Sequence, residues 1–443
     1  MTFWNLPKIP TAPFCPSEVS GTVEIPTTTN PWRRFLAFVG PGLLVSVGYM
    51  DPGNWATDIA GGAQFGYSLL SVIFISNLMA IILQSLCVRL GMVTGQDLAQ
   101  MCRTRFHPNL NFILWIFAEV AIIACDLAEL LGSAIALNLL FHIPLTWGVC
   151  LTALDIFIVL LLQGKSFRWL EALVLGLVST IGLCFFVEIL FAKPDWNAVF
   201  QGYIPTLEIV QQPERLYLAI SIIGATVMPH NLYLHSAIVQ TRSWQKSDIS
   251  LKEAIRFATA DSTIALFAAL FINSAILIVA AAAFHFSGNR QVADIRDAYK
   301  LLEPLLGTGA ASLLFGIALL ASGQSSTFTG TLAGQIIMEG FLNLRIPCWQ
   351  RRLVTRGLAI APALVGIILL GEAGVGKLLV LSQVILSLQL PFAIFPLILF
   401  TSNKKLMGDF VNQLWLKSFA WAIAFMITGL NIWLLGEVLE LIR

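Results

Sequence analysis

The feature that most constrains the fold is a series of eleven long apolar segments, which begins after Arg33-Arg34 and continues almost to the end of the chain. In order, the segments are 35–62, 67–90, 111–141, 144–163, 168–192, 216–240, 259–285, 305–333, 353–371, 378–401 and 414–436. Each approaches or exceeds the ~20 residues that a helix needs to cross a hydrocarbon layer ~30 Å thick. Since the backbone finds no water in that layer, each segment must be helical. The sequence therefore predicts an all-α polytopic membrane protein with eleven transmembrane helices.

The composition agrees with a membrane protein and excludes several other classes. Hydrophobic residues make up 57% of the chain and charged residues only 12%, whereas a soluble domain carries about 25% charged residues. The net charge of +1 gives no indication of a nucleic-acid partner. The seven cysteines are dispersed without a C-x-x-C pair, so we expect no disulfide framework and no zinc site. The start of the chain lacks the pattern of a signal peptide. We expect residues 1–31 to form a polar tail and residues 32–443 a single transmembrane domain.

The basic residues predict the orientation of the chain. With the N-terminus in the cytoplasm, nineteen of the 26 Lys and Arg residues lie in the tail or in cytoplasmic loops, and seven lie on the other side. Such an excess in short loops marks the cytoplasmic side. Eleven helices then place the C-terminus outside the cell, and the expected location is the inner (plasma) membrane.

Two of the segments carry helix-breaking residues near their centres: Asp51-Pro-Gly-Asn54 in the first and Met228-Pro-His-Asn231 in the sixth. Taken alone, the first is equally well an ordinary turn, Met228 is typical of core packing, and His230 is typical of a satisfied buried imidazole. The two inserts, however, open segments 1–5 and 6–10, and these halves have opposite topology because five is an odd number. Paired interruptions in inverted repeats indicate the midplane binding site of a transporter.

The residue types at the two inserts indicate a metal ion as the ligand. Asp51 offers a carboxylate and Asn54 an amide oxygen, and unwound carbonyl groups near Gly48 and Ala225 would add neutral oxygens. Met228 offers a thioether, a soft ligand that favours later transition metals over Mg²⁺ or Ca²⁺. Several oxygens, one sulfur and a single carboxylate suit a divalent transition metal better than a bulky organic molecule, which would need an apolar lining.

At these residues the chain resembles the Nramp family of proton-coupled divalent metal transporters, in its bacterial manganese-transporter branch. Three motifs carry the resemblance: Gly48-Tyr-Met-Asp51-Pro-Gly-Asn54, Gly224-Ala-Thr-Val-Met228-Pro-His230 and Gly323-Gln-Ser-Ser-Thr-Phe-Thr-Gly-Thr-Leu-Ala-Gly334-Gln335. The similarity extends from about residue 32 to the C-terminus. It implies a LeuT-like fold, with helices 1–5 and 6–10 as inverted repeats, broken helices 1 and 6, and an appended eleventh helix.

The resemblance also implies a set of metal ligands: Asp51, Asn54, Met228, the carbonyl group of Ala225, and a glutamine of the tenth helix. For that glutamine we expect Gln383, with Gln389 as the alternative. Polar contacts around the metal would come from Gly48, Asn77, Thr226 and Asn273. Magnesium transporters of the family replace the methionine, so Met228 argues for Mn²⁺ or Fe²⁺.

Proton coupling is expected to use the third helix, in which Glu119, Asp126 and Glu129 fall within one stripe of about 80°. Three carboxylates on one face of a transmembrane helix form a plausible proton relay. The resemblance adds Asp51, His230 and the arginines at the start of the ninth helix: Arg351, Arg352 and Arg356. Histidine suits such a transfer because its ordinary pKa is near 6.5. The alternative is that the carboxylates and arginines form static salt bridges.

These residues predict proton-coupled uptake of Mn²⁺, and also Fe²⁺, by a monomer that alternates its access between the two sides. Two other functions stay open: a passive channel for divalent metals and a LeuT-like transporter of an organic substrate. An enzyme is not expected, because H-E-x-x-H is absent, and ATP is not the energy source, because there is no G-x-x-x-x-G-K-[ST] motif. We expect no cofactor and no nucleotide partner; the metal ion and the proton are cargo.

Overall fold

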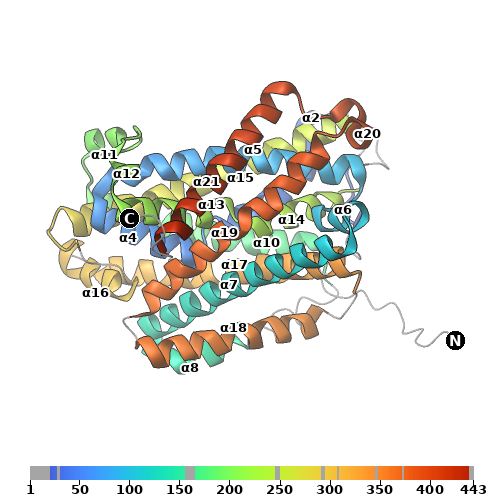
Figure 1. Cartoon of the computed structure of the whole chain (residues 1–443). Coiled ribbons are helices and arrows are strands. Elements are labelled where there is room, and N and C mark those ends of the chain that lie inside the picture. The colour runs from blue at the N-terminus through green and yellow to red at the C-terminus, as the bar shows by residue number, and fades with distance from the viewer. Residues whose placement is uncertain are drawn as a thin grey trace.

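The computed structural model describes residues 20–26, 30–154, 165–244, 250–290, 295–306, 309–344, 348–371 and 374–438 (Figure 1). Within these ranges the chain is helical throughout its apolar segments and forms no strand, apart from one isolated bridge between Val23 and Arg242. The expectation of an all-α membrane protein is therefore confirmed for the part of the chain that is described.

Each of the eleven apolar segments corresponds to helical structure. Segment 1 forms three helices, α2 (Pro31–Phe38), α3 (Pro41–Gly48) and α4 (Pro52–Phe65), and segment 6 forms two, α13 (Pro213–Val227) and α14 (Pro229–Ile238). Each of the other segments corresponds to one helix, in chain order α5 (Leu70–Thr94), α7 (Pro108–Phe141), α8 (Leu145–Thr152), α10 (Phe167–Ala192), α15 (Leu251–Ala280), α17 (Gly309–Leu342), α18 (Cys348–Leu370), α19 (Val375–Thr401) and α21 (Leu414–Val438). The second half of segment 4 lies outside the described residues. Short helices join the long ones: α6 (Leu98–Arg105), α11 (Trp196–Gly202), α12 (Glu208–Gln211), α16 (Ile295–Leu306) and α20 (Lys404–Met407).

Length and composition alone identify eight helical stretches among the described residues that could cross a membrane, fewer than the eleven segments. One of the eight, Pro52–Thr94, contains both α4 and α5. The chain reverses between them at Gly66, whose φ of 61° lies in the region that favours glycine. The apolar stretch of α18, Leu353–Leu369, is shorter than the others. The break in the first helix, the part of segment 4 outside the described residues and the short apolar stretch of α18 therefore account for the difference between eight and eleven.

The first and sixth helices are both interrupted at mid-length and lie side by side in opposite directions. α3 ends at Gly48 and α4 begins at Pro52, while α13 ends at Val227 and α14 begins at Pro229. In Figure 1, α4 and α13 lie toward the end that carries α11, α12 and α16, and α14 lies toward the end that carries α6 and α20. We call these the α11 end and the α6 end. The antiparallel arrangement of the two broken helices is that of an inverted repeat.

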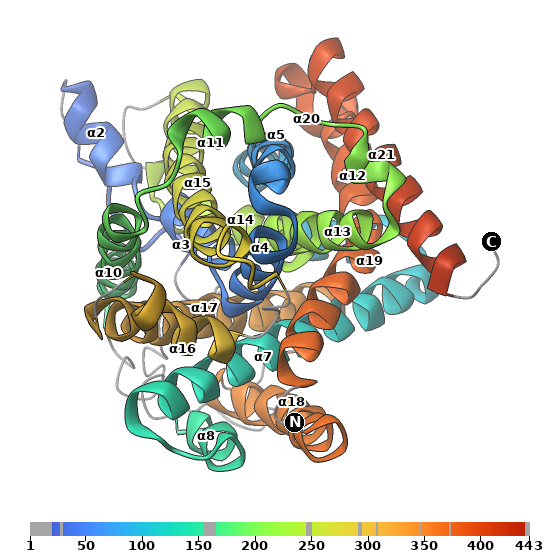
Figure 2. The same cartoon turned by 90° about the vertical axis from the view of Figure 1, so that its left-hand side faces the viewer.

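The broken helices occupy the middle of the bundle, and the longer helices surround them (Figure 2). Viewed from the α11 end, α4 and α13 lie between α5, α15, α17 and α19, and α7 crosses below them. The largest fully buried side chains include Trp55 and Tyr49 next to the first break, and Tyr233 in α14. The ring of Trp55 packs against Phe185 of α10 and Phe315 of α17, with centroid distances of 4.8 and 5.3 Å. The breaks are thus held inside a packed core.

Candidate metal site

The break in the first helix leaves backbone carbonyl groups without their helical hydrogen bonds, and side chains from other helices donate to these carbonyl groups instead. Asn273 Nδ2 in α15 donates a hydrogen bond of 2.7 Å to Tyr49 O, and Ser322 Oγ in α17 donates one of 2.6 Å to Met50 O. A buried carbonyl group without a partner costs free energy comparable to a lost hydrogen bond. These two polar side chains therefore stabilise an unwound backbone that lipid could not tolerate.

Asn54 lies where three oxygen atoms from the two broken helices converge. Its Nδ2 donates to Asp51 Oδ1 at 2.7 Å, to Ala225 O at 3.0 Å and to Gly48 O at 3.3 Å. One oxygen belongs to a carboxylate and two belong to carbonyl groups at the ends of α3 and α13. A group of oxygens around one point, with a charge of −1, is suited to a cation. Rotating the Asn54 amide by half a turn would replace its nitrogen with a further oxygen.

Asp51 is the residue that makes this point electrostatically unusual. It caps α4, and its Oδ1 accepts a second hydrogen bond of 2.8 Å from Asn54 N. Its Oδ2 is buried and has no hydrogen-bond partner among the described residues. Burying a carboxylate oxygen without a partner is costly, because no water replaces the lost hydration. A bound cation would remove that cost.

Met228 and Gln383 come to the same region from two other directions. Met228 is the residue at the α13–α14 break; it is fully buried and packs with Ala121, Cys125 and Leu386. Gln383 lies against the first turn of α4: a Cβ atom added to Gly53 would fall 1.8 Å from Gln383 Nε2. Its Oε1 has no partner among the described residues.

The alternative glutamine of the tenth helix lies elsewhere. Gln389 is almost two helical turns further along α19 than Gln383 and lies beside Tyr233 of α14. Of the two, Gln383 is the one adjacent to the break. The geometry therefore favours Gln383 over Gln389 as the candidate metal ligand from the tenth helix.

A second group of titratable side chains connects the breaks with α7. The Sγ atom of Cys125 lies 3.5 Å from Glu129 Oε1 and 3.7 Å from His230 Nε2. His230 is two residues beyond Met228, and its Nδ1 has no partner within the described ranges. Cys125 was not among the predicted site residues, because nothing in its local sequence indicates these neighbours.

Further along α7, the carboxylates face arginines of α18. Glu119 receives two hydrogen bonds from Arg351 Nη2, of 2.7 and 2.9 Å, and a third of 2.9 Å from Trp115 Nε1. Arg356 Nη1 lies 3.9 Å from Glu129 Oε2, while its Nη2 donates to Thr327 Oγ1 at 2.9 Å.

The structure gives less information on two other residues of the expected proton pathway, Asp126 and Arg352. Asp126 is buried between Glu119 and Glu129 on α7. Arg352 belongs to α18, but its side chain lies outside the described part of the structure. Two of the three predicted acidic residues, Glu119 and Glu129, therefore face predicted arginines, and these ion pairs are those that the static alternative expects.

The remaining expected polar residues are buried, and Asn273, Thr226 and Gly48 lie at or beside the breaks. Asn77 Nδ2 and Thr226 Oγ1 have no hydrogen-bond partner among the described residues, whereas Asn273 holds the first break as described above. Gly48 lies against Asn231, because a Cβ atom on Gly48 would fall 2.3 Å from Asn231 Nδ2. The contacts of Asn231 and Ser322 with the first helix were not predicted. The position of Ser322 directly before the Gly323 motif was the only feature of the sequence that could have indicated its role.

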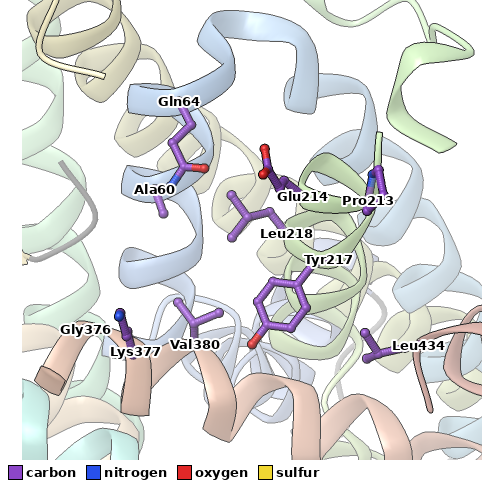
Figure 3. A pocket seen from close by; sticks show the side chains of 10 residues that line it. All are labelled: Ala60, Gln64, Pro213, Glu214, Tyr217, Leu218, Gly376, Lys377, Val380 and Leu434. Atoms are coloured by element: carbon purple, nitrogen blue, oxygen red, sulfur yellow. The ribbon is translucent and has the colours of Figure 1, made fainter. Parts of the chain in front are cut away.

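A pocket opens above the breaks on the side of the α11 end. It has a volume of about 560 Å³ and is lined by α4, α13, α19 and α21. Figure 3 shows Ala60 and Gln64 of α4 opposite Val380 and Lys377 of α19, with Leu218 of α13 between them. Three of these helices also carry Asp51, Ala225 and Gln383, so the pocket and the breaks share the same walls. Within the described ranges no group of three His, Cys, Asp or Glu side chains could hold a metal ion.

The chain matches one family along most of its length. A model of the family described as natural resistance-associated macrophage protein-like, Nramp, matches residues 42–437. The divalent metal cation transporter MntH of Nostoc sp. is 66% identical over 435 residues, which cover 98% of this chain and 97% of that protein. The divalent metal cation transporter MntH 1 of Pseudomonas aeruginosa is 58% identical over 432 residues, with 98% of both chains covered.

Solved structures give the same picture. A mutant of the Eremococcus coleocola manganese transporter superimposes with a TM-score of 0.87 at 44% identity, covering 94% of this chain and 89% of that one. Mhp1, a nucleobase-cation-symport-1 family transporter, superimposes with a TM-score of 0.60 at 17% identity, covering 86% of this chain and 81% of that one. At that identity the likeness concerns the fold alone.

Proposed function

The chain belongs to the Nramp family, and from this premise we propose that it carries Mn²⁺, and also Fe²⁺, into the cell together with protons by alternating access. It is a divalent metal cation transporter with the LeuT-like fold, as the resemblance in the sequence predicted. Its metal and protons are cargo, and we propose no chemical conversion. The observation that carries the proposal is the convergence of three oxygen atoms from both broken helices on one point, beside a carboxylate oxygen that has no hydrogen-bond partner among the described residues.

The proposed ligands are Asp51, Asn54, the carbonyl group of Ala225, Met228 and Gln383. Among these ligands only Asp51 carries a negative charge, so a divalent ion bound to them would keep a net positive charge. The thioether of Met228 adds a soft ligand, which Ca²⁺ and Mg²⁺ do not use. All of these groups come from one chain, which agrees with a functional monomer.

We propose that the α11 end faces outside and the α6 end faces the cytoplasm of the cell, with the protein in the plasma membrane. The excess of Lys and Arg near the α6 end supports this orientation. The pocket of about 560 Å³ then opens toward the outside, above the metal site. At the α6 end, Arg242 and Asp261 bind the backbone of the first helix, and a closed contact of this kind favours alternating access over a permanently open channel.

For the proton, we propose a route from Asp51 through His230 to Glu129 and along α7 to Asp126 and Glu119. The distances around Cys125 support the first part, because His230 and Glu129 both lie within 4 Å of one thiol. Arg356 and Arg351 would hold the carboxylates in their ionised form once the proton has left. The static alternative predicts that neutralising Glu129 leaves the pH dependence of transport unchanged.

The test is uptake of Mn²⁺ into proteoliposomes at an outside pH of about 5.5 and about 7.5, a range that spans histidine titration. We expect faster uptake at the lower pH for the native protein and a loss of that dependence in Glu129→Gln. Met228→Leu removes the sulfur at nearly constant volume, so we expect both it and Met228→Ala to reduce discrimination against Ca²⁺.

Each alternative has its own outcome in this assay. Uptake of Mn²⁺ that does not respond to pH would favour the passive channel. An absence of Mn²⁺ uptake by folded protein would contradict the metal site and favour an organic substrate. Iron is tested by competition with Fe²⁺ under reducing conditions.

A further inference from the structure

The bend between α2 and α3 is fixed by charged side chains at the α6 end. Arg242 lies just after the sixth helix, and its Nη2 donates to Val39 O at 2.8 Å, Phe38 O at 3.2 Å and Glu171 Oε1 at 2.8 Å. Its side chain is only 1% exposed. Arg168 Nη1 adds a bond of 2.6 Å to the same Val39 carbonyl group. These contacts tie α2 and α3, the half of the first broken helix at the α6 end, to the end of the sixth helix.

Gly40 completes this attachment from the other side of the bend. Its N–H donates to Asp261 Oδ2 at 3.2 Å, and Gly42 N donates to the same oxygen at 2.7 Å. Gly40 has a φ of 142°, and a Cβ atom there would fall 2.3 Å from the carboxyl group of Glu171. The bend therefore fits tightly among α10, α15 and the segment after α14.

Residues 20–26, which we call the strap, bind across the segment that contains Arg242. Three backbone hydrogen bonds of 2.9 Å join them: Gly21 N to Gln240 O, Val23 N to Thr241 O, and Ser243 N to Val23 O. Two of these bonds involve the residues immediately before and after Arg242. The strap therefore holds the backbone of the residue that clamps the first helix.

Two apolar side chains anchor the strap in the protein. Val23 and Ile25 are buried at 7% and 6% exposure, while Glu24 and Pro26 face outward. This alternation is that of an extended segment with one face against the protein. Ile25 belongs to a cluster formed with α2, α5, the end of the sixth helix and α15: Phe38, Val88, Met92, Val239, Ala254, Ile255 and Ala258.

We propose that the α6 ends of the two broken helices form a docking groove for the chain's own residues 20–26, and that the bound strap keeps the α6 end closed. The inference rests on the proposed alternating access. For the inner half of the first helix to move away, the bonds from Arg242 to Val39 and Phe38 must break and the cluster around Ile25 must separate. An undocked strap makes both steps easier, so the strap sets the population of the state open at the α6 end.

The test measures accessibility at the α6 end and does not depend on transport. Ser46 is buried in α3, and Ser46→Cys serves as the reporter in a background with Cys15, Cys150 and Cys348 replaced by Ser. The rate of labelling by a polar maleimide is measured without metal in detergent. The same background without the reporter gives the blank. We compare the intact chain with Val23→Asp, Ile25→Asp and a deletion of residues 1–26.

Pro26→Asp is the matched control, because it adds the same charge at an outward-facing position of the strap. Burial of one such apolar side chain changes an equilibrium by about tenfold or more. We therefore expect labelling to rise about tenfold in Val23→Asp and Ile25→Asp, to rise at least as much in the deletion, which removes both anchors, and to stay unchanged in Pro26→Asp. A synthetic peptide of residues 18–27 is expected to return labelling of the deletion variant toward the native rate, and a scrambled peptide is not.

Equal labelling of the intact chain and the deletion variant would overturn the proposal, as would a rise in Pro26→Asp as large as in Val23→Asp. Failure of the peptide to protect a folded deletion variant would also contradict it. Size-exclusion chromatography of each variant separates these outcomes from unfolding. A chain that labels as expected but carries no Mn²⁺ would contradict the proposed function and leave the docking groove intact.

Discussion

Gly53→Ala tests whether the tenth helix is packed directly on the first break. The added Cβ atom would fall 1.8 Å from Gln383 Nε2 and 2.3 Å from its Cδ, while ordinary contact begins at 3.4 Å. The amide of Gln383 must therefore retreat by about 1.6 Å, or α4 and α19 must separate. The contacted atoms are the flexible end of Gln383, but that side chain is fully buried, so its retreat must displace its neighbours. Overpacking of this kind costs about 1–3 kcal/mol. The Gly-to-Ala gain in helix propensity, about 1 kcal/mol at most, offsets only part of it.

The assay is the thermal unfolding of purified protein together with the apparent affinity for Mn²⁺ in uptake. We expect Gly53→Ala to lower both the unfolding temperature and the affinity. Gly176→Ala inside α10 is the control, because no described residue beyond its own helix backbone lies within 4 Å of the added Cβ atom, so that variant keeps the gain in helix propensity without a clash. In the double variant Gly53→Ala/Gln383→Ala the clash is absent, so stability returns while the affinity for Mn²⁺ stays low. A Gly53→Ala protein as stable as the native one, with unchanged uptake, would refute this account of the packing.

Two further predictions concern stability. Asp97 caps α6 outside the membrane, and burial raises its pKa from 3.8 to about 7; a group whose pKa is higher in the folded state contributes stability below about pH 4 that is lost as the pH rises toward 7. Asp97→Asn preserves the cap. We therefore expect its unfolding temperature to fall less than that of the native protein when the pH is raised from about 5 to about 8. An identical pH profile of the unfolding temperature would contradict this. Asn273→Ala leaves Tyr49 O without its donor and should cost about 1–3 kcal/mol in unfolding free energy, whereas Thr263→Ala, whose hydroxyl bonds only to its own helix, should cost less; equal costs would show that Asn273 does not support the break.

The breaks themselves could be predicted from the sequence, because their cause is local. Pro52 and Pro229 cannot donate to the helix that precedes them, and each stands inside an apolar run of spanning length. The ligand types followed from the same few residues. The structure brings Asp51, Asn54 and Ala225 together within hydrogen-bonding distance, as their positions in the two breaks led us to expect.

The partners that support the breaks could not be predicted, because they lie far away in the sequence. Asn273 is 224 residues from Tyr49, and Ser322 is 272 residues from Met50. Nothing local distinguishes either residue from the other Ser and Asn residues of apolar helices. The role of Arg242 was also missed: it counted only as one positive charge of a cytoplasmic loop, although it binds two carbonyl groups of the first helix. One sequence gives periodicity and breakers, but it does not give helix pairing.

The contrast between the two ends of the bundle bears on how the transporter works. At the α11 end a pocket lies above the site, whereas at the α6 end the first helix is tied down by Arg242, Asp261 and the strap. A bound metal can shift this balance only by the difference between its affinities for the two states. Reversing a 99:1 population takes a ratio of about 10⁴, or about 5.5 kcal/mol. Under the proposed alternating access, the α6 end must therefore be held by several modest contacts, so that one ion is enough to open it. Hydrogen bonds to backbone carbonyl groups, one buried ion pair and a short strap with two apolar anchors are contacts of that size.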